Sequence, residues 1–87
     1  MFYVYVLYSK KFDRYYVGMT VDIERRLSEH NSGKMISTKA YKPWIIAHFE
    51  VLNTRKEARK REKYLKSSAG RRWRKQNIKI DIDDKVN

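Results

Sequence analysis

The segment that most constrains the fold is residues 54–69, TRKEARKREKYLKSSA, which reads as one helix. It contains no Pro or Gly before Gly70. Thr54 followed three residues later by Glu57 is the pattern of a capping box, in which two side chains satisfy backbone groups at a helix start. We therefore predict a single helix over residues 54–69, and the capping role accounts for Glu57.

A second carboxylate lies in the middle of the apolar stripe of this helix. At 3.6 residues per turn the stripe consists of Ala58, Glu62, Leu65 and Ala69, while most other positions are Lys or Arg. An unpaired charge on a packing face is costly. Either an arginine such as Arg26 pairs with Glu62, or a metal ion binds it. The second alternative would make Glu62 part of an active site.

The preceding chain predicts three strands and one further helix. The strands fall at residues 1–8, 15–20 and 44–52, and the helix, with Thr20 as its N-cap, at residues 21–30. The first strand is apolar on both faces, which is typical of a central strand. Gly18 in the second strand suggests close approach of another backbone or a ligand.

The third strand alternates between apolar and polar residues, which favours a half-exposed strand. Its apolar face would hold Ile45, Ala47, Phe49 and Val51, with His48 and Glu50 opposite. Residues 34–42 form a polar connection without a clear period, and residues 71–77 form a short helix anchored by Trp73. The tail, residues 78–87, reads as an added strand or a frayed end.

The fold class predicted from this order is α+β. A three-stranded antiparallel sheet is flanked by helices in the order ββαβα, with a short additional helix at the end. One domain is expected over residues 1–77 and a C-terminal tail over residues 78–87. A chain of 87 residues is long enough for one modest core.

Positive charge is concentrated in the last third of the chain. The net charge is +11, and residues 55–75 contain eleven Lys or Arg against two Glu, so nine of the eleven net charges lie there. Such a basic segment, together with seven Tyr and two Trp, favours binding to nucleic acid. The alternative is a solvated helix that only keeps the protein soluble. The residues predicted to contact phosphates are Arg59, Lys60, Lys63 and Lys66.

Several other classes of protein are disfavoured by the sequence. There is no Cys, which excludes disulfides and thiolate chemistry. No apolar run approaches the roughly 20 residues of a membrane helix, and the N-terminus lacks the pattern of a signal peptide. The expected location is therefore the cytoplasm, with no membrane partner.

Five polar residues can be placed together as a candidate site: Tyr5, Tyr16, Arg26, His30 and Glu62. With these residues the chain resembles the GIY-YIG nuclease superfamily over about residues 1–76. The two tripeptides of that family align with Tyr3-Val4-Tyr5 and with Tyr16-Val17-Gly18. The run DIERRLSEH supplies its Arg and His, and REKYLK supplies its Glu. The chain departs from the pattern at Tyr3, where the family has Gly.

The resemblance implies a metal-dependent endonuclease that hydrolyses phosphodiester bonds in DNA, with structured or damaged DNA as the expected substrate of a repair-type enzyme. It implies that Glu62 holds one Mg²⁺ or Mn²⁺, and that Arg26 stabilises charge on the phosphoryl oxygens. One tyrosine would accept the proton of the attacking water, with Tyr16 preferred and Tyr5 sharing the role. His30 belongs to the same catalytic set.

Two other functions remain open at the level of sequence. The chain could be a nucleic-acid-binding module with weak or lost catalysis, or a protein that binds RNA, since a small basic domain with exposed aromatics suits RNA as well. The sequence does not decide between DNA and RNA.

Overall fold

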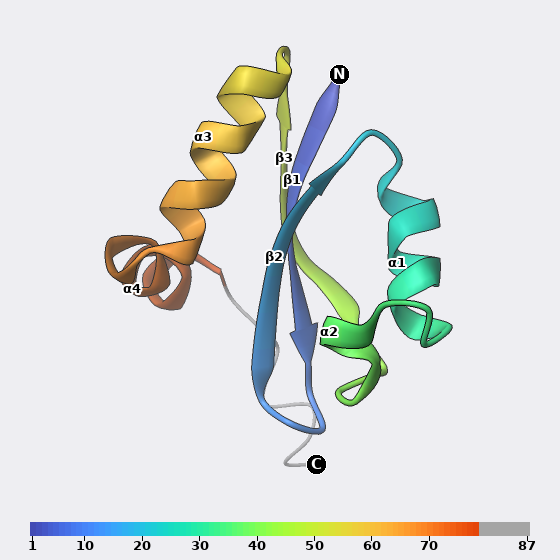
Figure 1. The fold of residues 1–87 in the computed structure, drawn as a ribbon. Helices are drawn as coiled ribbons and strands as arrows, with labels where there is room; N and C mark the ends of the chain where they lie inside the picture. The colour runs from blue at the N-terminus through green and yellow to red at the C-terminus, as the bar shows by residue number, and fades with distance from the viewer. Residues whose placement is uncertain (79–87) are drawn as a thin grey trace.

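The computed structural model describes residues 1–78, which form a three-stranded antiparallel sheet with a pair of helices on each face (Figure 1). The strand order is β2-β1-β3. The strands are β1 (Phe2–Ser9), β2 (Arg14–Thr20) and β3 (Ile45–Leu52), and the helices are α1 (Ile23–Asn31), α2 (Ile36–Lys39), α3 (Arg55–Lys66) and α4 (Ser68–Asn77). The α+β class and the order ββαβα are confirmed.

The central position of β1 follows from its apolar residues on both faces. Val4 and Val6 pack in the cluster beneath α3, and Tyr5 and Leu7 pack in the cluster beneath α1. All four side chains are nearly inaccessible to solvent. The prediction of a central strand covered on both sides is therefore confirmed.

The predicted helix over residues 54–69 is two helices. The capping box of Thr54 and Glu57 is present at the start of α3. However, the backbone of Ser67 is extended, and its hydroxyl accepts a hydrogen bond from the backbone N–H of Gly70 to begin α4. Ala69 is consequently exposed rather than part of the apolar stripe.

The predicted faces of β3 are wrong in part. The pairing of β1 with β3 shifts between Val6 and Leu7, and Ala47 has no partner residue on β1. The side chains of β3 therefore change from one face of the sheet to the other at this point. Phe49 remains about half exposed. Its polar neighbour Glu50 lies under α3 and accepts hydrogen bonds from Arg61 at 2.8 and 3.0 Å. This ion pair covers Glu50, and the ring of Trp73, 5.3 Å from that of His48, covers His48. The two polar residues therefore lie under the helices and not on the solvent side.

Other boundaries differ by smaller amounts. Asp22, not Thr20, is the N-cap of α1, because the carboxylate of Asp22 accepts a hydrogen bond from the backbone N–H of Arg25. The connection predicted over residues 34–42 contains the short helix α2. Ile78, assigned to the tail by sequence, is 7% exposed and belongs to the core under α3. The predicted strand or frayed end beyond it lies outside the described residues.

Candidate active site

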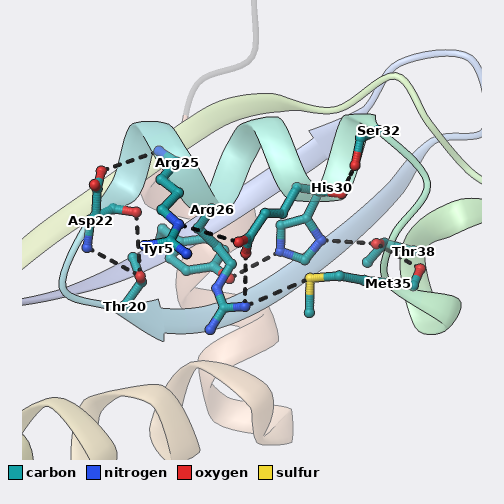
Figure 2. Close-up of polar contacts among 10 residues, drawn as sticks. Tyr5, Thr20, Asp22, Arg25, Arg26, His30, Ser32, Met35 and Thr38 are labelled. Carbon is teal, nitrogen blue, oxygen red and sulfur yellow. Dashed lines mark hydrogen bonds and ion pairs between the residues drawn. The ribbon is translucent and has the colours of Figure 1, made fainter.

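A buried row of hydrogen-bonded side chains connects the sheet to α1 and α2. The Tyr5 hydroxyl lies 3.0 Å from His30 Nε2, and His30 Nδ1 lies 2.8 Å from Thr38 Oγ1 (Figure 2). His30 and Thr38 are fully buried. The three side chains come from β1, α1 and α2, so the chain of hydrogen bonds exists only when these elements are packed together.

The environment of His30 favours its neutral form. Burial lowers its pKa from the usual 6.5, and the nearby Arg26 lowers it further, while Glu29 opposes the shift. His30 is therefore not the helix-terminal cation that its position near the end of α1 would suggest. The Thr38 hydroxyl donates a hydrogen bond to the Met35 carbonyl oxygen. The hydroxyl oxygen of Thr38 is therefore left to accept a hydrogen bond from Nδ1–H of His30. In that tautomer Nε2 accepts the Tyr5 hydroxyl proton.

Gly18 is required by the ring of Tyr5. The two residues are direct partners between β1 and β2, and a Cβ added at Gly18 would lie 2.5 Å from the Tyr5 hydroxyl oxygen and 3.2 Å from Cε2 of Tyr16. The close approach predicted at Gly18 is therefore made by the side chains of Tyr5 and Tyr16. Without a side chain at Gly18, Tyr5 lies across β2 and reaches His30.

Tyr16 and Tyr5 lie in different environments. The Tyr16 ring is 4.8 Å from that of His30 and 6.4 Å from that of Tyr5, centroid to centroid, and Tyr16 is partly exposed. Tyr5 is 2% exposed. Burial raises the pKa of Tyr5 well above its usual range, and Tyr16 and Glu62 raise it further against the opposing effect of Arg26. Of the two side chains, that of Tyr16 is the more accessible to solvent.

Arg26 projects from α1 toward the side of the sheet where α3 passes, as Figure 2 shows. Its Nη1 lies 3.2 Å from a Glu29 carboxylate oxygen and 3.9 Å from Met35 Sδ. Glu29 also pairs with Arg25 at 3.4 Å. Arg26 and Glu62 do not form an ion pair in the structure, contrary to the alternative raised from the sequence.

Glu62 is largely buried and is paired within its own helix. Its side chain is 14% exposed, one carboxylate oxygen lies 3.0 Å from Lys66 Nζ, and the other lies 4.0 Å from Arg59 Nε. The negative charge predicted on the packing face therefore has basic partners on α3. Within residues 1–78, no three His, Asp or Glu side chains converge as a metal-binding cluster.

A pocket of about 340 Å³ lies where side chains of α1 and α3 meet. It lies at the end of β2 and is lined by Arg26 from α1 and by Arg55 and Arg59 from α3, together with Thr20. Because α1 and α3 cover opposite faces of the sheet (Figure 1), their side chains meet only around the exposed edge of β2. Three guanidinium groups around one pocket favour an anionic ligand such as a phosphate.

The four basic residues predicted to contact nucleic acid are all exposed on α3, but they differ in their surroundings. Arg59 lines the pocket and Lys66 pairs with Glu62. Lys60 and Lys63 have no ion pair within the part of the chain that the structure describes.

Two residues of the site were not identified from the sequence. Arg55 lies in the pocket, and its only sequence signal is its place in the first turn of the basic helix. Thr38 is the buried partner of His30, and it belongs to a polar segment in which no periodic pattern marks it.

Comparison with known proteins agrees with this geometry. Residues 1–77 match the family model of the GIY-YIG catalytic domain. The chain is 39% identical over 66 residues to a UPF0213 protein of Haloquadratum walsbyi, covering 75% of this chain and 73% of that protein. It is 32% identical over 79 residues to a UPF0213 protein of Staphylococcus haemolyticus, covering 90% of each.

A solved structure shares the fold. The solution NMR structure of a UPF0213 protein from Bacillus halodurans matches with a TM-score of 0.54 and 27% sequence identity, covering all of this chain and 95% of the other. Family model, relatives and fold agree, and the chain belongs to the GIY-YIG family, a nuclease superfamily, and is similar to UPF0213 proteins.

Proposed function

We propose that this protein is a divalent-metal-dependent endonuclease that hydrolyses phosphodiester bonds in DNA. The observation that carries the proposal is the pocket at the edge of β2, which is lined by Arg26, Arg55 and Arg59, and Arg59 also lies 4.0 Å from a carboxylate oxygen of Glu62. Guanidinium groups suit the planar, bidentate recognition of phosphate oxygens. Structured or damaged DNA is the proposed substrate of this repair-type activity, and the cytoplasm is the proposed location.

The residues present fit a hard divalent cation. Glu62 offers a carboxylate, and Mg²⁺ commonly binds through one or two carboxylates plus substrate phosphates while it keeps several waters. The competing cation Lys66 is half exposed, so its side chain can move into solvent when a metal ion binds. When bound by Glu62, Mg²⁺ or Mn²⁺ would supply charge stabilisation at the reacting phosphate.

The protein's own residues are assigned the following roles. Arg26 would bind the non-bridging phosphoryl oxygens as negative charge develops there. The hydroxyl of Tyr16, a partly exposed residue, would accept the proton of the attacking water. Tyr5 is a positioning residue, because its hydroxyl is held by His30 and burial raises its pKa. His30, fixed by Thr38, sets the orientation of both rings.

One observation favours the alternative of a binding module without catalysis. Glu62 already has Lys66 and Arg59 as partners, so its carboxylate needs no metal ion to be tolerated on the packing face. In that case the same basic surface would bind DNA or RNA and no strand would be cut.

Substitution of Glu62 by Gln separates the two functions. We expect Glu62→Gln to abolish metal-dependent cleavage, because an amide ligates a divalent cation poorly while filling nearly the same volume. The substitution should keep or raise DNA affinity, because it removes a negative charge near phosphate. The measurement is cleavage of single-stranded, duplex and branched DNA, and of RNA, in Mg²⁺, Mn²⁺ or EDTA.

Glu57→Gln is the matched control on the same helix. Glu57 closes the capping box, so its substitution should leave cleavage intact and cost about 0.5–2 kcal/mol of stability. Cleavage by Glu62→Gln at the rate of the parent would overturn the assignment of the metal ligand, as would loss of cleavage in Glu57→Gln alone. Binding without any cleavage by the parent would establish the alternative function.

A further inference from the structure

A second basic hollow lies between α4 and the hairpin that joins β1 to β2. Two adjoining pockets of about 430 Å³ each share Tyr15, Arg71 and Arg74, and Lys75 and Arg14 extend the lining at either side. We call this surface the α4–hairpin groove. Tyr15 is 40% exposed, so the groove combines cationic side chains with an accessible aromatic ring.

The cations of this groove have no acidic partners within residues 1–78. None of the ion pairs there involves Arg71, Arg74 or Lys75. The Nε–H of Arg74 is buried and has no hydrogen-bond partner among the described residues, while its guanidinium carbon lies 5.2 Å from the centroid of the Tyr15 ring. Asp13, at the rim, accepts the Tyr8 hydroxyl.

The unpartnered Arg74 indicates what the groove binds. A buried guanidinium donor without an acceptor is costly, and burial lowers the pKa of Arg74 with a further contribution from the neighbouring Arg71, against the opposing effect of Tyr15. An anion in the groove would provide both the acceptor and the counter-charge. The adjacent aromatic ring suits an anion that carries a base able to stack on it.

The groove is separate from the pocket that contains Arg26. Arg14 and Thr20 are the first and last residues of β2, and the groove lies at the first end and the Arg26 pocket at the last. Six residue steps of a strand at roughly 3.4 Å each separate the two ends by about 20 Å. That length corresponds to about six base pairs of duplex DNA.

We propose that the α4–hairpin groove binds the phosphodiester backbone of the nucleic-acid substrate about six base pairs from the phosphate held at Arg26. The proposal rests on the nuclease function proposed above, and it adds a second anchoring site on the same ligand. One nucleic acid bound along the edge of β2 would contact both sites at once. Ligands shorter than this span would contact only one of them.

The test is equilibrium binding of fluorescein-labelled DNA in EDTA, measured by anisotropy over a range of salt concentrations. The variant is Arg71→Gln with Lys75→Gln, since both side chains are exposed and their loss should leave the fold intact. The matched control is Lys34→Gln with Lys39→Gln, which changes the charge equally at exposed positions outside the groove. Thermal melting checks the fold of each variant.

With a duplex of about 20 base pairs, losing two phosphate contacts should reduce the slope of log affinity against log salt by about 1.8. The same relation gives a roughly 30-fold loss of affinity at about 0.15 M salt. With a stem-loop of about four base pairs, too short to reach both sites, the affinity should change less than about twofold. The control should match the parent on both ligands.

An unchanged salt slope in the Arg71/Lys75 variant would overturn the proposal, and so would equal losses in the control. Cleavage plays no part in this assay, so the two proposals fail separately. If the groove variant loses slope while Glu62→Gln still cuts, the nuclease site is wrong. If Glu62→Gln is inactive while the groove variant binds like the parent, the groove is wrong.

Discussion

At the scale of single residues, Arg26 and Arg25 show how one position along a helix changes the environment of a side chain. Both pair with Glu29, but the Arg25 side chain is 76% exposed while that of Arg26 is 35% exposed and lines the pocket with α3. The effects of substituting the two neighbouring arginines can therefore be compared directly. They carry the same charge, and of the two only Arg26 lines the pocket between α1 and α3.

We expect Arg26→Lys to lose about 100-fold or more in single-turnover cleavage while DNA affinity stays near that of the parent. Lysine keeps the charge but lacks the planar fork that binds two phosphoryl oxygens, and losing one such preorganised donor costs about this much. Arg25→Lys is the matched control and should cut normally. Equal losses at the two positions, or none at Arg26, would contradict the assignment.

His30 makes the stability of the fold depend on pH. Its pKa is lowered from 6.5 in the folded state, mainly by burial, so the unfolded chain binds a proton more tightly than the folded chain does. Protonation therefore favours unfolding, and the free energy of unfolding should fall as the pH drops below about 6.5. It should level off again only below the folded-state pKa.

The measurement is urea denaturation between about pH 7.5 and pH 5. We expect His30→Gln to be less stable at neutral pH, because the hydrogen bonds to Tyr5 and Thr38 are altered. Its stability should depend less on pH across this interval. His48→Gln serves as the control for the other histidine. A His30 variant with the pH dependence of the parent would show that another group is responsible.

At the scale of elements, the junction of α3 and α4 depends on Gly70. A Cβ at this buried residue would overlap the Tyr64 carbonyl oxygen and lie 2.5 Å from Leu65 Cα. The obstacles are backbone atoms of α3, which cannot rotate away as a side chain can. The close contact between the two helices therefore requires glycine, although glycine is otherwise unfavourable inside a helix.

Gly70→Ala should destabilise the protein by about 1–3 kcal/mol through overpacking. Each kcal/mol lowers the melting temperature by roughly 4–8 °C in a domain of this size. Thermal unfolding followed by circular dichroism measures the change. Ala69→Gly, at the exposed neighbouring position, should cost about 1 kcal/mol from helix propensity alone. A higher melting temperature in Gly70→Ala would show that the helices can separate without cost.

At the scale of the whole molecule, positive charge lies along one side of the sheet. The basic residues of α3 and α4 extend from the Arg26 pocket to the α4–hairpin groove, on the face of the sheet opposite α1 (Figure 1). Contacts between such a surface and phosphates release counterions, so binding should weaken steeply as salt rises. No helix among residues 1–78 is long and apolar enough to cross a membrane.

We expect Arg59→Gln, Lys60→Gln and Lys63→Gln together to weaken binding to all DNA sequences alike. If each side chain contacts one phosphate, the salt slope should fall by about 2.7. Affinities for several unrelated duplexes between about 50 and 200 mM salt provide the measurement. A parent affinity that does not change with salt over this range would exclude phosphate contacts as the main source of binding.

The sequence by itself determined the types and order of the main elements, because these follow from neighbouring residues. The β-branched and aromatic run of β1 requires cover on both faces, and Thr54 with Glu57 marks the start of α3 wherever that helix packs. Short motifs that resemble those of the GIY-YIG family also identified Tyr5, Tyr16, Arg26, His30 and Glu62 as the candidate set. These features need no knowledge of how distant segments meet.

Only the tertiary structure decided how those residues are arranged. Tyr5 and His30 are 25 positions apart, and their hydrogen bond, completed by Thr38, depends on packing of α1 and α2 on the sheet. The break at Ser67, the covered polar face of β3 and the arginine pocket at the edge of β2 likewise depend on contacts between separate elements. Local sequence patterns do not encode such contacts, because their free energy comes from surfaces that meet only in the folded chain.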